Sequence, residues 1–142
     1  MNAPIPSPAD APPLLFHHVG VACRDIEREA ARLEALGYVA EGEPFVDPVQ
    51  GIRGVFVGHI APRLELLEPL GPGGVLQPWL DSGTKLYHLA YETPDLAASL
   101  VHLRAARGRV VVEPVPAVAF GGRHIAFVML ATGMLVELIA MK

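Results

Sequence analysis

The chain has a single cysteine, Cys23, among its 142 residues. One thiol cannot form an internal disulfide, and a protein without disulfides fits a reducing compartment. No apolar run approaches the roughly 18 residues of a membrane-spanning helix. The first residues carry proline and aspartate in place of the basic and apolar parts of a signal peptide. We therefore expect a cytoplasmic protein with no membrane partner.

Positive charge is also scarce and is not concentrated anywhere. The chain has 11 Lys and Arg residues against 15 Asp and Glu residues, which gives a formal net charge of −4. Without a Lys/Arg run, nucleic acid and anionic membranes are poor partners. The hydrophobic fraction of 51% is ample for the core of one ordinary domain.

The composition divides the chain into a tail and one domain. Residues 1–13 contain five prolines and little that could be buried, which predicts a mobile Pro-rich tail. Residues 14–142 form the domain, with two modules at about 14–70 and 85–142. The segment 71–84, which starts with Gly71-Pro72-Gly73-Gly74, is the expected linker.

The two modules repeat a pattern of chemically active residues. Three residue types recur at spacings of 70 to 72 residues: His18 and His88, Asp25 and Asp95, and Glu65 and Glu137. In each half the His lies on an alternating apolar run, the Asp precedes a run of helical spacing, and the Glu interrupts an apolar strand. A nearly constant offset of this kind indicates an internal duplication.

Each half predicts the element order β-α-β-β-β. In the first half, Asp25 caps a helix whose apolar face is Ile26, Ala30, Leu33 and Leu36 and which Gly37 ends. The expected strands of the first half are 14–22, 38–46, 52–60 and 64–69, and those of the second are 86–92, 109–115, 123–130 and 134–140. The fold class is therefore α+β, with a curved eight-stranded mixed sheet around a metal cleft and helices on its outer face.

The paired His and Glu residues predict a metal site formed by His18, Glu65, His88 and Glu137. A carboxylate on an apolar strand is costly to bury unless it has a partner, and a divalent cation is an efficient one. Two imidazoles and two carboxylates suit Mn²⁺, Co²⁺, Ni²⁺, Fe²⁺ or Zn²⁺ better than Ca²⁺ or Mg²⁺.

Structural interpretations of the same residues remain open at this point. A histidine on a strand is often structural, and Leu64-Glu65-Leu66 also fits a strand whose Glu points to solvent. His17, next to His18, points to the opposite face and is expected to be structural or outward-pointing rather than a ligand. Cys23 is expected to be a small buried residue, and Trp79 a packing residue or a substrate contact.

The chain resembles the vicinal oxygen chelate superfamily over Phe16 to Ala140, and within it most resembles the methylmalonyl-CoA epimerases. The stretches that carry the resemblance are His18-Val19-Gly20-Val21-Ala22, Gln50-Gly51-Ile52, Leu64-Glu65-Leu66-Leu67-Glu68-Pro69-Leu70, Tyr87-His88-Leu89-Ala90-Tyr91, Gly121-Gly122-Arg123-His124-Ile125-Ala126-Phe127 and Gly133-Met134-Leu135-Val136-Glu137-Leu138. The resemblance places the four metal positions of the family on His18, Glu65, His88 and Glu137. It also implies a homodimer and an acyl-CoA or other acyl thioester as substrate.

The resemblance implies proton transfer next to a thioester carbonyl, with an enolate stabilised by the divalent metal ion. Glu137 is the first candidate general base, and Glu65 the candidate for the opposite face of the carbon. Two departures bear on the substrate. Some similar epimerases have an acid/base Glu where this chain has Gly54, and a His-Pro-Lys turn where it has Met129-Leu130-Ala131-Thr132.

Two alternative functions follow from the same superfamily. The pairing of two ligand glutamates resembles glyoxalase I, a lactoylglutathione lyase that acts on a hemithioacetal. Other members bind a drug or antibiotic without chemistry, but these usually lack the full ligand set. An extradiol dioxygenase uses two His and one Glu on iron, so the fourth candidate ligand argues against that activity.

Overall fold

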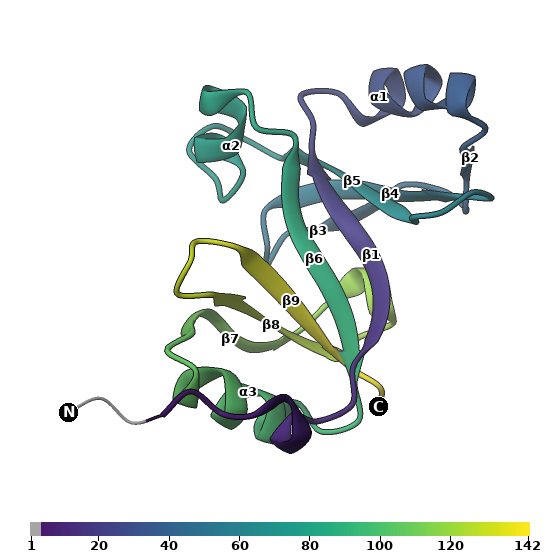
Figure 1. Ribbon diagram of the computed structural model, residues 1–142. Coiled ribbons are helices and arrows are strands. Elements are labelled where there is room, and N and C mark those ends of the chain that lie inside the picture. The colour runs from purple at the N-terminus through teal and green to yellow at the C-terminus, as the bar shows by residue number, and fades with distance from the viewer. Residues whose placement is uncertain (1–3) are drawn as a thin grey trace. The chain divides into compact units, whose positions relative to one another are not determined.

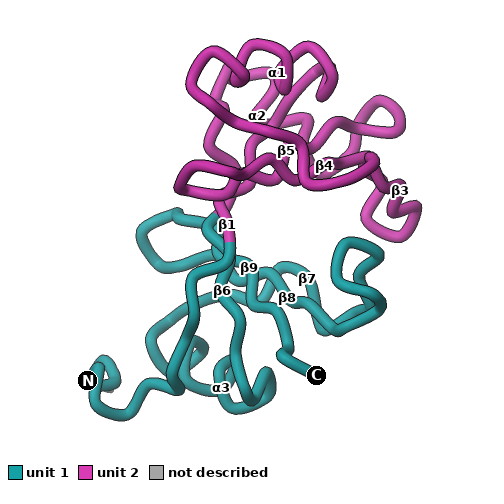
Figure 2. Tube along the Cα trace, turned by 90° about the vertical axis from the view of Figure 1, so that its right-hand side faces the viewer, with its two compact units in different colours: residues 1–17, 89–142 teal, residues 18–88 magenta. Residues whose placement is uncertain are grey.

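The computed structural model describes residues 4–142, and this part divides into two compact units (Figure 2). Unit 2 is residues 18–88, and unit 1 is the described chain up to residue 17 together with residues 89–142. Both boundaries fall inside strands, β1 (Leu15–Ala22) and β6 (Leu86–Thr93). Residues 1–3 of the expected tail lie outside the described residues, and Pro8–Asp10 of that tail form a short 3-10 helix.

Unit 2 contains the first α-helix and a mixed group of strands. Its strand order is β2-β4-β5-β1, with β3 also paired to β4, and β1 runs parallel to β5. Asp25 caps the helix by accepting a hydrogen bond from Arg28 N at 3.0 Å, and Gly37 ends it with φ +104°. The elements between β1 and β6 are α1 (Ile26–Leu33), β2 (Val39–Ala40), β3 (Phe45–Asp47), β4 (Ile52–Gly58), β5 (Leu64–Pro69) and α2 (Gln77–Ser82).

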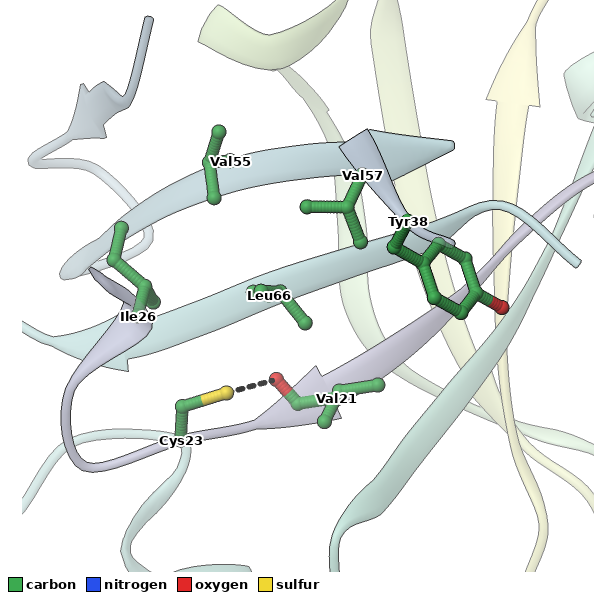
Figure 3. Close-up of a cluster of buried hydrophobic side chains, with 7 residues drawn as sticks. All are labelled: Val21, Cys23, Ile26, Tyr38, Val55, Val57 and Leu66. Carbon is green, nitrogen blue, oxygen red and sulfur yellow. Dashed lines mark hydrogen bonds between the residues drawn. The ribbon is translucent and has the colours of Figure 1, made fainter. Parts of the chain in front are cut away.

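The core of unit 2 lies between α1 and the strands beside it (Figure 1). Figure 3 shows its buried side chains, which are Val21, Cys23, Ile26, Tyr38, Val55, Val57 and Leu66. The Cys23 thiol lies 3.6 Å from the Val21 carbonyl and is fully buried, as expected for a small core residue. Alternate residues of β4 and β5 therefore face α1, and the residues between them face the other side of the strands.

Unit 1 repeats this arrangement with α3 in place of α1. Asp95 caps α3 through Ala98 N at 2.9 Å, and Leu100 and Leu103 pack on Val136 and Leu138. The order is β6-β9-β8-β7, with β6 parallel to β9. The elements are α3 (Leu96–Ala105), β7 (Arg109–Pro116), β8 (His124–Met129) and β9 (Leu135–Ala140). The α+β class with mixed strand pairing is thus confirmed.

Two local predictions were wrong. The described residues form nine strands where eight were predicted, because the expected strand 38–46 is split into β2 and β3. Gly42 adopts φ +126° and Pro44 has no amide hydrogen, so pairing with β4 is interrupted between them. Leu36 is 67% exposed, because a 3-10 turn at Glu34–Leu36 rotates it off the apolar face of α1.

The helices of the described part are short. The longest, α3, has 10 residues, and none of those between residues 4 and 142 is long and apolar enough to cross a bilayer.

Candidate functional site

Strand register brings His18 and Glu65 onto one face of unit 2. On the parallel pair β1 and β5, Gly20 is the register partner of Glu65, and His18 lies two residues before Gly20. Since alternate strand residues share a face, His18, Gly20 and Glu65 all project away from α1. Glu65 is 4% exposed, so the alternative in which it points to solvent is wrong.

Gly20 makes room for His88. A Cβ at position 20 would lie 2.6 Å from His88 Nε2 and closer still to two other atoms of that ring, so any larger residue would displace the imidazole. The backbone of β1 thus forms a cradle for the ring. The sequence alone drew attention to His18-Val19-Gly20 only as a family motif, because the neighbour that requires the glycine is far away in the chain.

Three donor atoms converge at this point. His18 Nε2 lies 3.1 Å from Glu65 Oε1, His88 Nε2 lies 3.5 Å from the same oxygen, and the two Nε2 atoms are 3.1 Å apart. The two imidazole side chains are 0% exposed and the Glu65 side chain 6%. We call His18, Glu65 and His88 the His/Glu cluster.

The Glu65 carboxylate gives the cluster a negative charge. Burial alone raises the pKa of the Glu65 carboxyl, but the charge of His18 and the hydrogen bonds from His18 and His88 outweigh it and hold the pKa at about 2, below the usual 4.5. Glu65 is therefore ionised at neutral pH, although it is buried.

The donor set fits a divalent transition metal. Metal–nitrogen and metal–oxygen bonds of about 2.1 Å at roughly right angles put neighbouring donor atoms about 3 Å apart, close to the three separations in the cluster. Two imidazole nitrogens that face each other need a proton or a cation between them, because both cannot present lone pairs at hydrogen-bond distance. Mixed nitrogen and carboxylate donors suit Mn²⁺, Fe²⁺, Co²⁺, Ni²⁺ or Zn²⁺.

Glu137 occupies the corresponding position in unit 1. It is 2% exposed on β9, between Val136 and Leu138, which pack toward α3. Its register partner on β6 is Ala90, two residues after His88, just as Gly20 comes two residues after His18. The duplicated Glu therefore has the same strand environment in each unit, and its role as a metal ligand or base stays a prediction.

An apolar wall lies beside the cluster in unit 2. The His18 ring meets Phe56 edge to face at 5.2 Å, and Phe56 lies 6.0 Å from Phe45 on β3. At Gly54 a Cβ would lie 2.7 Å from Phe45 Cζ and 2.9 Å from Leu67 Cδ2. The Phe45 ring therefore fills the space that a side chain at position 54 would need.

Another buried carboxylate, Asp47, was not singled out from the sequence. Its two oxygens accept hydrogen bonds from Gln50 N at 3.2 Å and Gln50 Nε2 at 2.9 Å. These bonds close the turn between β3 and β4, so they give Asp47 a structural role.

Two residues that the sequence analysis left outside the metal site are packed elsewhere. His17 meets the ring of Phe120 at 5.4 Å, in unit 1. Trp79 meets Tyr87 edge to face at 4.7 Å, which agrees with a packing role.

Comparison with known proteins gives a family match and several similar enzymes. Residues 17–127 match the model of the glyoxalase/bleomycin resistance protein/dioxygenase superfamily. The ethylmalonyl-CoA/methylmalonyl-CoA epimerase of Cereibacter sphaeroides is 29% identical over 114 residues, which cover 79% of this chain and 85% of that protein. The human mitochondrial methylmalonyl-CoA epimerase is 29% identical over 110 residues, 75% of this chain and 61% of that protein.

Solved structures of methylmalonyl-CoA epimerases are also similar to this chain. The methylmalonyl-CoA epimerase of Mycobacterium tuberculosis superimposes with a TM-score of 0.75 at 27% identity, over 88% of this chain and 86% of that one. A Glu-to-Gln variant of the Streptomyces coelicolor epimerase, in complex with 2-nitronate-propionyl-CoA, gives a TM-score of 0.76 at 25% identity, over 90% and 98%.

Proposed function

Because this chain belongs to the glyoxalase/bleomycin resistance protein/dioxygenase superfamily, we propose that it is a metal-dependent proton-transfer enzyme of the methylmalonyl-CoA epimerase type. It is homologous to those enzymes over most of its length. The observation that carries the metal dependence is the buried convergence of His18, Glu65 and His88. The substrate is an acyl thioester, since related enzymes are named for, or bound to, acyl-CoA compounds.

His18, Glu65 and His88 would hold the metal ion, with Glu137 as the fourth ligand. Co²⁺, Mn²⁺, Ni²⁺, Zn²⁺ and Fe²⁺ all suit this donor set. When bound, the cation supplies charge that stabilises an enolate oxygen. The Gly20 cradle contributes by fixing the ring of His88, so the donor atoms are oriented before any ligand arrives.

Glu137 is the proposed general base that removes the proton next to the carbonyl. Inversion of that carbon requires a proton donor on its opposite face. Gly54 has no side chain to act there, and Phe45 fills the space, so Glu65 is the proposed second carboxylate. Assembly as a homodimer and a cytoplasmic location remain predictions from the sequence.

The apolar wall also favours a second candidate, a glyoxalase I-type lyase acting on a hemithioacetal. Such an enzyme would use Glu65 and Glu137, the two carboxylates of the proposed ligand set, and no group at position 54. A protein that only binds a small molecule remains as the non-catalytic alternative.

The test is exchange of the α-proton of methylmalonyl-CoA in D₂O, followed by NMR with the metal-loaded protein. We expect exchange that EDTA abolishes and that His88→Ala lacks, because His88 supplies one of the donors. Tight metal binding without exchange would reject this substrate class and favour the hemithioacetal. Exchange that persists after the metal is removed would reject the metal-dependent mechanism.

A further inference from the structure

A cavity lies in unit 2, and none of the residues of the His/Glu cluster lines it. Its volume is about 310 Å³, at the lower end of the range for small-molecule sites. It is lined by residues before and within α1, by the end of α2 and by the segment that leads into β6. Both helices can be followed in Figure 1. We call it the arginine pocket, after Arg24, Arg28 and Arg32.

The pocket is cationic in a chain whose net charge is negative. Four basic side chains line it, the three arginines and Lys85, against two carboxylates. An anionic ligand is the natural complement of such a lining, because attraction is strongest where charges of one sign are gathered in a concave surface.

Both carboxylates in the lining already have partners. Asp25 accepts from Arg28 N and so caps α1, while Glu29 is paired with Lys85 Nζ. Within the described part of the chain, the guanidinium groups of Arg28 and Arg32 form no salt bridge. Two permanent positive charges are therefore available to a ligand.

The spacing of the arginines adds to this argument. Arg28 and Arg32 are four residues apart and lie on one side of α1, while Arg24, which precedes the N-cap residue, lines the same pocket. Like charges at this spacing repel each other and lower helix stability. An anion bound to both would remove that repulsion. Arg24 also donates a hydrogen bond to Leu80 O at 3.1 Å, which ties the start of α1 to α2.

An aromatic surface completes the pocket. Trp79, the only tryptophan of the chain, lines it and is half-buried. The edge-to-face contact with Tyr87 at 4.7 Å holds the indole in place. A fixed indole next to guanidinium groups is suited to a ligand that combines an aromatic base with phosphates.

We propose that the arginine pocket binds the phosphorylated nucleotide end of an acyl-CoA, with the base against Trp79 and the phosphates on Arg28 and Arg32. This assignment rests on the proposed acyl thioester function. Strand β1 connects the two places, because Ala22 lines the pocket and follows His18 by four residues, about 13 Å at the rise of an extended strand. The pantetheine chain of the ligand would cover this distance.

The first experiment uses Trp79 fluorescence, which reports on the pocket directly because the chain has no other tryptophan. Adenosine 3′,5′-bisphosphate, the nucleotide end of coenzyme A, is titrated into the full-length protein. We expect a saturable change whose Kd rises by about tenfold or more in the Arg28→Gln/Arg32→Gln variant, since charge-assisted phosphate contacts are lost. The control, Arg104→Gln/Arg109→Gln, makes the same charge change at exposed positions of unit 1 and is expected to keep the Kd.

Three results of this titration would overturn the proposal. They are no saturable change, equal weakening by the control variant, and binding of inorganic pyrophosphate as tight as that of the nucleotide. Far-UV circular dichroism checks the fold of each variant, and Arg32→Gln alone provides a second, milder substitution.

A second experiment separates this inference from the proposed function. The kcat/KM for a methylmalonyl thioester of coenzyme A is divided by that for the corresponding pantetheine thioester, which lacks the nucleotide. Arg28→Gln/Arg32→Gln is expected to lower this ratio about tenfold, and the control to leave it unchanged. If the enzyme exchanges the α-proton but the ratio is unchanged, the nucleotide site in the arginine pocket is refuted and the proposed function stands. If the nucleotide binds in a way that depends on Arg28 and Arg32 but no α-proton exchange is seen, the nucleotide site stands and the proposed function is refuted.

Discussion

Gly20→Ala should damage the candidate metal centre with a single methyl group. The added Cβ would lie 2.6 Å from His88 Nε2, whereas ordinary contacts are at 3.4–4 Å. The imidazole must therefore move by about 1 Å, because the surrounding interior is close-packed and the backbone of β1 is held by its pairing with β5. His88 would then no longer point its Nε2 atom at Glu65 and His18.

The expected size follows from the role of Gly20 as a support for a ligand. Loss of such a support typically lowers metal affinity by about 10–100-fold, or roughly 1.4–2.7 kcal/mol. The overpacking also destabilises the metal-free fold by about 1–3 kcal/mol.

The assay is a competition titration with a chelator of known affinity, combined with denaturant unfolding of the metal-free protein. Gly71→Ala is the matched control, because Gly71 has no positive φ and no atom within 4 Å of an added Cβ. In a His88→Ala background the clash is gone, so Gly20→Ala should cost little stability there. Metal affinity equal to that of the unsubstituted protein in Gly20→Ala would refute the reasoning.

Three further predictions concern the buried thiol, Gly54 and the helix caps. Burial raises the pKa of the Cys23 thiol from 9.0 to about 12, so at pH 8 the folded protein should react with a thiol reagent about 1000-fold more slowly than the unfolded chain. The same shift keeps its contribution to stability intact below pH 9 and removes it progressively from pH 9 toward 12. Equal thiol rates in the two states would contradict this. Gly54→Ala should cost about 1–3 kcal/mol in denaturant unfolding, because its Cβ would lie 2.7 Å from Phe45 Cζ, and should cost much less in a Phe45→Ala background; equal costs in both would show that Phe45 is not the obstacle. Asp25→Ala and Asp95→Ala should each lower stability by about 1 kcal/mol, since each removes a helix N-cap; unchanged midpoints would argue against the caps.

The local features of the fold could be predicted because they depend on neighbours in the chain. An Asp before a helical run caps it wherever the helix lies, and Gly37 ends α1 because it tolerates a positive φ. The strands were found to within a few residues because their alternation is a short-range pattern. The strand predicted at 38–46 was wrong because Gly42 and Pro44, both local signals that interrupt a strand, divide it into β2 and β3.

The candidate site could be predicted in part because the chain carries its pattern twice. A single His or Glu on a strand says little, but the recurrence of both at a nearly constant offset singled out His18, Glu65 and His88, which the structure brings together. The part of Glu137 in that site stays a prediction from the same repeat.

Tertiary structure decided what depends on residues far apart in the chain. The burial of Glu65, the cradle that Gly20 forms for His88, and the Phe45 ring over Gly54 all arise from strand pairing and cannot be read from any one stretch. The arginine pocket is of the same kind. The sequence places Arg28 and Arg32 on one side of a helix, but only folding brings Trp79 and Lys85 to that side and pairs Lys85 with Glu29, because these contacts join segments separated by more than 40 residues.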